Sequence, residues 1–300
     1  MLKIAWAAGY AHPLPPGHRF PMEKYNLIPE QLLLEGTIEK TNLYEPGLAS
    51  DHIIERIHSH EYFKKLKENA LSSSEIRKIG FPFSNKLLLR EIQIVEGTRQ
   101  CALFALENGV SLNIAGGTHH AYRDRGEGFC ILNDIAIAAQ YLVDNKLARK
   151  ILIIDLDVHQ GNGTASIFLH RPDIFTLSIH GANNYPAKKE KSTWDIPLPD
   201  KTPDNIYLQT VKESLGRVIE DFSPDFIFYQ SGVDILTTDK LGKLSVSLQG
   251  CKERDKIVFQ AAKKNKIPIA GAMGGGYSEK ISIVVEAHAN TFRVAQEIFF

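Results

Sequence analysis

The sequence predicts a single α/β domain over residues 1–300, built as a three-layer open parallel sheet with helices on both faces. Three observations support this fold class. Short apolar runs alternate with helix-like segments, the runs lack the polar alternation of half-exposed strands, and neither a repeat nor a linker divides the chain. With 43% hydrophobic residues among 300, the chain has ample material for one core.

The apolar runs predict the strands of this sheet. They cover residues 112–117, 150–159, 174–181, 225–234 and 267–276. Between these runs, helical spacing and good helix formers predict helices over residues 132–148, 205–222 and 248–266. A parallel sheet needs such crossovers, because consecutive parallel strands cannot be joined by a tight turn.

The N-terminal third has a different pattern. Residues 20–40 and 49–70 have the spacing of amphipathic helices that decorate the sheet edge. We expect residues 70–85 to form a loop-rich connection, and residues 80–95 to continue it at the rim of the site.

Charge and composition exclude several classes of partner. The 35 basic and 35 acidic residues balance, so the sequence predicts no direct nucleic acid binding. No apolar stretch reaches the roughly 20 residues of a membrane span. Cys101, Cys130 and Cys251 are an odd number of widely spaced cysteines, which favours a reducing, cytoplasmic location over a disulfide framework. Nothing in these features indicates the oligomeric state.

All five predicted strands run into glycine, histidine or aspartate at their carboxyl ends. In open α/β sheets the ligand site lies outside these ends, because loops from several strands converge there. The polar residues of this chain are therefore expected to meet at that edge.

The segment "DLDVHQGNG" suggests a metal site. Asp155, Asp157 and His159 recur at period two, so in an extended strand they point to one side, where oxygen and nitrogen donors suit a divalent metal. A solvated loop or helix cap is the plain alternative. An aspartyl-phosphate phosphotransferase also has a DxD after a strand, but His159 disfavours it because magnesium prefers oxygen ligands.

The segment "YQSGVD" adds Asp234 just past another strand. Asp157, His159 and Asp234 would form a three-ligand site with open positions, as in a catalytic zinc centre. The alternative is that Asp234 caps a helix.

The tandem His119 and His120 follow two glycines in "GGTHHAY". Imidazole titrates in the range that acid/base catalysis needs, although a structural role is the alternative. Two imidazoles beside a cation resist protonation unless a carboxylate stabilises the protonated form of one of them. Asp155 is available for this role.

The segment "MGGGYSE" places Tyr277 directly after three glycines. A phosphate-binding loop is disfavoured because no Lys-Ser/Thr pair follows the glycines. The phenol of Tyr277 can instead donate to an oxyanion that forms at a polarised carbonyl.

Five motifs in order, "GGTHHA", "GFCILND", "DLDVHQGNGT", "YQSGVD" and "GGGY", resemble the histone deacetylase family, within the arginase/deacetylase fold. The segments "SGVDILTTDKLGKLSVS", "NNYP" and "HPLPPGHRFPMEKY" look most like the class IV, bacterial-type branch. The resemblance implies one zinc ion on Asp157, His159 and Asp234. It implies a potassium ion near Asp155 and Ser178.

The resemblance also implies roles for other side chains. His120 would be the general base and acid, His119 its electrostatic partner oriented by Asp155, and Tyr277 the donor to the carbonyl oxygen. The walls of an acyl-lysine tunnel would be formed by Gly128, Phe129, Tyr185 and Gly275. Arg19 matches loosely a residue near an inner cavity through which the released acid leaves.

Three departures from the family pattern stand out. Asn162 occupies the position where class I members carry aspartate behind the second histidine, which lowers the expected pKa of His120. Residues 80–95 lack an aspartate that grips a peptide backbone, and residues 181–195 carry three lysines in a rebuilt rim loop. Leu241 stands where a polyamine-selective relative has glutamate, which disfavours polyamines as substrates.

The implied activity is zinc-dependent removal of acetyl or longer fatty-acyl groups from the lysine side-chain amine of proteins or peptides. Class IV relatives favour long acyl chains. The alternatives are a deacetylase of a small acylated amine, a binuclear ureohydrolase of the same fold, and a non-catalytic acyl-lysine binding module. Against the ureohydrolase, Gly161 stands two residues after His159, where that class needs another carboxylate.

Overall fold

The computed structural model describes residues 1–300, and its eight strands form one parallel sheet in the order β2-β1-β3-β8-β7-β4-β5-β6. The strands are β1 (Lys3–Ala5), β2 (Leu43–Tyr44), β3 (Val110–Asn113), β4 (Ile151–Asp155), β5 (Ile174–Gly181), β6 (Trp194–Leu198), β7 (Phe226–Gln230) and β8 (Ile269–Ala272). Since β2 and β6 remain unpaired on their outer edges, the sheet is open, and the predicted fold class is confirmed.

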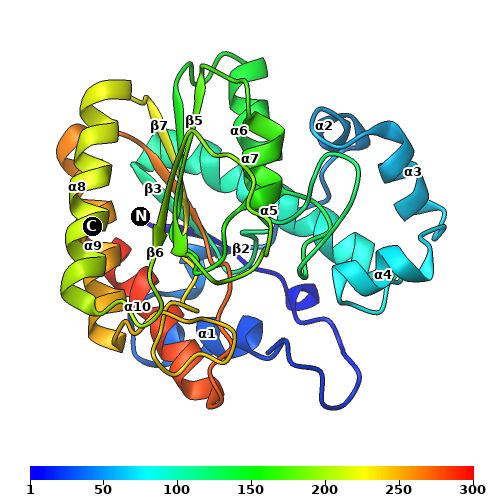
Figure 1. Ribbon diagram of the computed structural model, residues 1–300, viewed down its shortest axis with the longest axis horizontal. Coiled ribbons are helices and arrows are strands. Elements are labelled where there is room, and N and C mark those ends of the chain that lie inside the picture. Colours follow the sequence, from blue (N-terminus) through cyan, green and yellow to red (C-terminus); the bar gives the residue numbers. More distant parts are fainter.

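Ten α-helices surround the sheet. They are α1 (Lys24–Leu34), α2 (Asp51–Glu55), α3 (His60–Lys67), α4 (Ser73–Ile79), α5 (Asn85–Asn108), α6 (Asp134–Asp144), α7 (Asn162–Phe168), α8 (Asp204–Phe222), α9 (Leu248–Asn265) and α10 (Ile281–Phe299), with short 3-10 turns at Ala8–Tyr10 and Lys40–Asn42. Figure 1 shows α8, α9 and α10 on one side of the sheet and α5, α6 and α7 on the other, while α2 to α4 lie beyond α5. None of the helices combines the length and apolarity needed to cross a lipid bilayer.

All five predicted strands exist, but most end earlier than the sequence suggested. The strand predicted over residues 150–159 stops at Asp155, so Asp157 and His159 do not alternate along an extended strand. Instead, the Asp155 carboxylate accepts from the Asp157 backbone N–H at 3.2 Å, and the Asp157 carboxylate accepts from the His159 N–H at 3.0 Å. Such side-chain bonds two residues along the chain bend it into turns.

The strands β1, β2 and β6 were not predicted. β1 and β2 contain only three and two residues, too few for a period to be recognised. β6 is an edge strand that contains Pro197, a residue that disfavours a strand prediction but is tolerated at edges.

The helices predicted over residues 132–148, 205–222 and 248–266 are α6, α8 and α9. The two connections expected over residues 70–85 and 80–95 were wrong. The first contains α4, which begins with a capping box between Ser72 and Glu75. The second lies mostly in α5, whose 24 residues are capped by the Ser84 side chain.

In the N-terminal third, the helix expected over residues 20–40 is α1, whereas the segment 49–70 divides into α2 and α3 because Ser59 caps a new helix. Two further helices, α7 and α10, were not anticipated.

Candidate metal centre and active site

Asp157, His159 and Asp234 meet at the carboxyl edge of the sheet. They lie on the loops that follow β4 and β7, which are neighbours in the sheet. One donor atom from each residue lies within 4.8 Å of the others, and all three side chains are buried. The Nδ1 atom of His159 lies 3.0 Å from Asp157 Oδ1 and 3.1 Å from Asp234 Oδ2.

A buried arginine holds both loops in place. The guanidinium of Arg254, on α9, donates to the carbonyls of Leu156, Ser231 and Gly232, which lie one to three residues before Asp157 and Asp234 along the chain. Asp255 pairs with Arg254 at 2.8 Å and also accepts from the Tyr229 and Thr291 hydroxyls, so the pair is fully buried and hydrogen-bonded.

The backbone of the GGGY segment closes the site from the other side. Gly275 N–H donates to Asp157 Oδ2 at 2.8 Å. A Cβ atom at Gly275 would lie 2.1 Å from Asp234 Oδ2, so only glycine allows this approach.

The three residues are buried, and each changes the protonation of the others. Burial and the neighbouring charge of Asp157 raise the pKa of Asp234. Burial lowers the pKa of His159, but its hydrogen bonds to the two carboxylates outweigh burial and raise that pKa to about 10. Without a metal the imidazole proton bridges the two carboxylates, and a divalent ion would replace that proton on the same three donors, a set that suits zinc or a similar metal.

The two adjacent histidines have opposite environments. His119 Nδ1 lies 2.7 Å from Asp155 Oδ2. Burial opposes protonation of His119, but the charges of Asp155 and Asp157 raise its pKa to about 8. His120 has no carboxylate partner, and burial together with His119 and His159 lowers its pKa well below 6.5. Protonation is therefore favoured on His119 and disfavoured on His120, although the centroids of the two rings are only 4.1 Å apart.

The hydrogen bond to Asn162 sets the tautomer of His120. His120 Nδ1 lies 2.6 Å from Asn162 Oδ1, and the Asn162 amide nitrogen donates to the Tyr122 hydroxyl at 2.9 Å. The Tyr122 hydroxyl donates to Glu190 at 3.2 Å, so it accepts from the Asn162 amide nitrogen, and the amide oxygen faces His120. Since an amide oxygen only accepts, the hydrogen of this bond lies on His120 Nδ1. The lone pair of His120 then lies on Nε2, where it can accept a proton.

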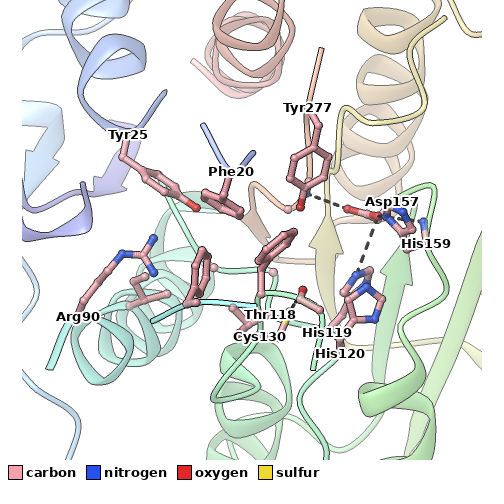
Figure 2. Close-up of a pocket in the computed structure, with 18 residues that line it drawn as sticks. Phe20, Tyr25, Arg90, Thr118, His119, His120, Cys130, Asp157, His159 and Tyr277 are labelled. Atoms are coloured by element: carbon pink, nitrogen blue, oxygen red, sulfur yellow. Dashed lines mark hydrogen bonds and ion pairs between the residues drawn. The ribbon is translucent and has the colours of Figure 1, made fainter. Parts of the chain in front are cut away.

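Tyr277 lies on the same side of the pocket as Asp157 and His159 (Figure 2). Its backbone N–H donates to Asp239 at 2.6 Å, and its ring packs at 5.9 Å from that of Phe20. Burial and the charges of Asp234 and Asp157 raise the pKa of Tyr277 well above 10, so the phenol stays protonated and can donate a hydrogen bond.

Phe129 and Tyr185 lie at the approach to these groups. Gly128 and Phe129 both have positive φ, and their N–H groups donate to the carbonyls of Lys78 and Ile79 at 3.0 and 2.7 Å. The unpredicted helix α4 therefore positions this wall. Tyr185 stands edge-on to His120 at 4.9 Å and is 42% exposed, so it lies nearer the solvent. Leu241 lines the outer mouth with Tyr185.

Residues 18–292 match the histone deacetylase domain. The chain belongs to the histone deacetylase family. Membership makes it a hydrolase of the deacetylase type, as the resemblance of its five motifs indicated.

Relatives of this deacetylase chain occur in bacteria and plants. An uncharacterised protein of a Picosynechococcus strain is 38% identical over 99% of both chains. Histone deacetylase 2 of Arabidopsis thaliana is 30% identical over 89% of this chain and 72% of its own length. The acetoin utilization protein AcuC of Staphylococcus aureus is 31% identical over 87% of this chain and 73% of its own.

Solved structures agree with the fold. A histone deacetylase homologue from Aquifex aeolicus superposes with a TM-score of 0.84 at 24% identity, covering 98% of this chain and 84% of that one.

The histone deacetylase chain also has an inner hollow of about 40 Å³ that begins at the site, where Asp157, His159 and Tyr277 border it. Phe20, Tyr25, Phe81 and Arg90 line it, and Figure 2 shows Arg90 across the hollow from Asp157. The expectation that Arg19 lies near this cavity was wrong, since Arg19 is exposed at the outer mouth.

Sequence reasoning missed Arg90 because the segment around it was taken for a connection. Its guanidinium is buried, contacts Glu91 and donates to the Tyr10 carbonyl at 2.6 Å. The available signal was an arginine inside the apolar run "LLLREIQIV", where a buried charge needs a partner or a ligand.

The "ILND" end of the second motif supports the histidine pair. Asp134 accepts from the backbone N–H groups of Gly117 and Thr118 at 3.1 and 2.8 Å, and Asn133 donates to the Ala121 carbonyl at 3.1 Å. These bonds fix both ends of the loop that carries the two histidines.

His58 binds the backbone at Asn133, next to this loop, and its burial should make the free energy of unfolding depend on pH. Its Nε2 accepts from Asn133 N–H at 2.9 Å, and burial lowers the pKa of His58 to about 4. Below pH 6.5 the unfolded chain binds a proton that the folded chain does not, so this contribution to stability is lost as pH falls. A fall in pH from about 7 to about 5 should therefore reduce the free energy of unfolding by about 2 kcal/mol, because the unfolded chain gains a proton on His58 that the folded chain does not.

Urea unfolding at the two pH values measures this effect. His58→Gln, which keeps an acceptor but cannot titrate, should reduce the loss of stability, whereas the exposed His52→Gln should not. Equal pH dependence in wild type and His58→Gln would count against the protonation of His58.

Proposed function

We propose that the chain is a zinc-dependent hydrolase that removes acyl groups from acylated amines of the lysine side-chain type, in proteins, peptides or smaller molecules. The observation that supports this most strongly is the convergence of three metal donors with a neutral histidine and a protonated tyrosine. Asp157, His159, His120 and Tyr277 border the pockets that lead from the mouth to the inner hollow, and Asp234 is buried behind them.

Asp157, His159 and Asp234 would hold a zinc ion, which would supply Lewis-acid polarisation of the scissile carbonyl and a lowered pKa for a nearby water molecule. His120 Nε2 accepts the proton of the attacking water and later donates it to the departing amine. Proton transfer of this kind contributes roughly 100- to 10,000-fold in rate.

His119 and Tyr277 stabilise charge. The Asp155 carboxylate, 2.7 Å from His119 Nδ1, favours the cationic form of His119, and a positive charge on this ring at the site would stabilise an oxyanion there. The Tyr277 hydroxyl donates to the same oxygen, and a typical donor of this kind stabilises the transition state by about 2.7 to 4 kcal/mol.

The inner hollow favours a short acyl group. About 40 Å³ lined by Phe20, Tyr25, Phe81 and Ile94 accommodates an acetyl group, whereas a myristoyl chain requires these rings to move. The positive charge of Arg90 at this hollow suits the carboxylate that the reaction releases.

A deacylation panel tests the proposed function. Acetyl-, octanoyl- and myristoyl-lysine peptides of one sequence should be hydrolysed in decreasing order of kcat/KM, and a hydroxamate chelator should suppress all three. Myristoyl peptides turned over faster than acetyl peptides would overturn the short-chain assignment. Turnover that persists with the chelator would overturn the metal dependence.

The alternatives have less support. A binuclear ureohydrolase needs additional carboxylates, but the cluster at this site contains only Asp157, His159 and Asp234. A non-catalytic binding module does not require a His120 whose Nδ1–H is bonded to Asn162 and whose Nε2 is free to accept a proton.

A structural potassium ion stays a prediction. Asp155 and Ser178 are opposite one another in the pairing of β4 with β5, which supports a shared site, and the Ser178 hydroxyl already contacts His180. The three free, buried cysteines support a reducing compartment such as the cytoplasm.

A further inference from the structure

The outer mouth of the tunnel is a hollow of about 310 Å³ with a local positive charge. Arg19, Lys78 and Lys243 line it, and no aspartate or glutamate does. The whole chain is neutral, with 35 basic and 35 acidic residues, so this concentration of charge belongs to the mouth itself.

These cations have no acidic partner. Arg19, Lys78 and Lys243 take part in none of the ion pairs of the protein, and all three are exposed. The guanidinium of Arg19 rests 5.0 Å above the Phe129 ring, which places it over the tunnel wall.

Two carboxylates near the rim, those of Glu127 and Asp239, already accept hydrogen bonds from other groups. Glu127 accepts from Arg125 at 2.9 Å and from the Tyr185 hydroxyl at 2.8 Å. Asp239 accepts from the Tyr277 backbone N–H at 2.6 Å, besides two N–H groups of its own loop. Both carboxylates keep their charge, but Glu127 forms its ion pair with Arg125, and neither carboxylate forms one with a cation of the mouth.

Two of the cations are anchored to the tunnel by their backbones. The Lys78 carbonyl accepts from Gly128 N–H at 3.0 Å, and Lys243 N–H donates to Asn184 Oδ1 at 3.3 Å. These two lysines come from separate segments of the chain, so their charges surround one opening. An anion at the mouth can therefore contact more than one cation.

We propose that the acylated amine carries a carboxylate or phosphate group next to the acylated side chain. This inference rests on the proposed function. With the acyl group in the inner hollow, the rest of the substrate must pass through the mouth. There the three cations attract an anion and repel a polycation, in agreement with the absence of a glutamate at Leu241.

Matched peptides test this inference. Acetyl-lysine flanked by two glutamates, two glutamines or two lysines differs only in charge. At low ionic strength the acidic peptide should exceed the neutral one in kcat/KM by on the order of tenfold, mostly through KM. The preference should shrink when ionic strength rises from about 0.05 M to about 0.5 M.

The triple variant Arg19→Gln, Lys78→Gln, Lys243→Gln should lose the preference for the acidic peptide and gain activity on the lysine-flanked one. Lys212→Gln, at an exposed position on α8, serves as the matched control and should keep the preference. Equal rates for acidic and neutral peptides in the wild type, or an unchanged preference in the triple variant, would overturn the inference.

A small-molecule arm identifies the source of the anion. An Nα-blocked Nε-acetyl-lysine with a free carboxylate is compared with its carboxamide. A preference here supports small acids as well as peptides as substrates, and a preference confined to the peptides assigns the anion to a peptide.

Binding separates this inference from the proposed function. Fluorescence anisotropy with the same labelled peptides reports affinity without turnover. If no peptide is hydrolysed but the acidic one binds more tightly and the triple variant loses that advantage, the anion preference stands and the hydrolase proposal falls. If peptides are hydrolysed without regard to charge, only the anion preference falls.

Discussion

Replacing His120 by glutamine should lower kcat for an acetyl-lysine peptide by about 100- to 10,000-fold, the range for a positioned proton-transfer group. The physical reason is that His120 is the neutral imidazole of the site, with its Nδ1–H bonded to Asn162 and its Nε2 free to accept a proton. Glutamine fills most of the same space but has no group that exchanges a proton near pH 7.

Bound metal is the second readout for this variant. Because His120 is not among the three donors of the cluster, His120→Gln should retain wild-type metal content. The exposed His170→Gln is the matched control and should change neither activity nor metal. Wild-type turnover in His120→Gln would exclude it as the base, and loss of metal would instead assign it to the metal site.

Asp234→Asn should remove the bound metal and reduce turnover by more than two orders of magnitude. Loss of a group that merely supports a ligand typically costs about 10- to 100-fold in metal affinity or activity, so loss of a charged ligand costs more. Asparagine keeps an oxygen for the Val158 N–H, which Asp234 binds at 2.9 Å, and the loop should therefore keep its shape.

Elemental analysis and turnover of purified Asp234→Asn measure this prediction together. Asp221→Asn, which removes an exposed carboxylate paired with Arg217 on α8, is the control for the loss of one negative charge. If Asp234→Asn kept its metal and its activity, Asp234 could not be a ligand.

The sequence was sufficient to predict the fold and to place the polar residues at one edge of the sheet, because both depend on patterns within short segments of the chain. Buried parallel strands are continuous apolar runs, and their carboxyl ends must lie on one edge, so Asp157 and Asp234 could be placed together without coordinates. The route by which they meet was not predictable. Side-chain bonds that Asp155 and Asp157 accept from the backbone, rather than strand alternation, bend the chain at Asp157 and His159.

The parts that were missed depend on long-range contacts. Arg254 binds three carbonyls from two loops, and nothing local in the α9 sequence specifies those partners. Arg90 and α4 were missed because their segment was taken for a loop. The buried face of α5 and the capping box of α4 carried that information in the sequence.

The most direct test is a titration of metal-free protein with zinc, following the rate of acetyl-lysine hydrolysis. Asp157, His159 and Asp234 form the one cluster of metal donors at the site, so activity should be absent without zinc, rise linearly and end at one zinc ion per chain. Full activity in the metal-free protein, or an end point at two ions per chain, would contradict a single catalytic metal held by these three residues.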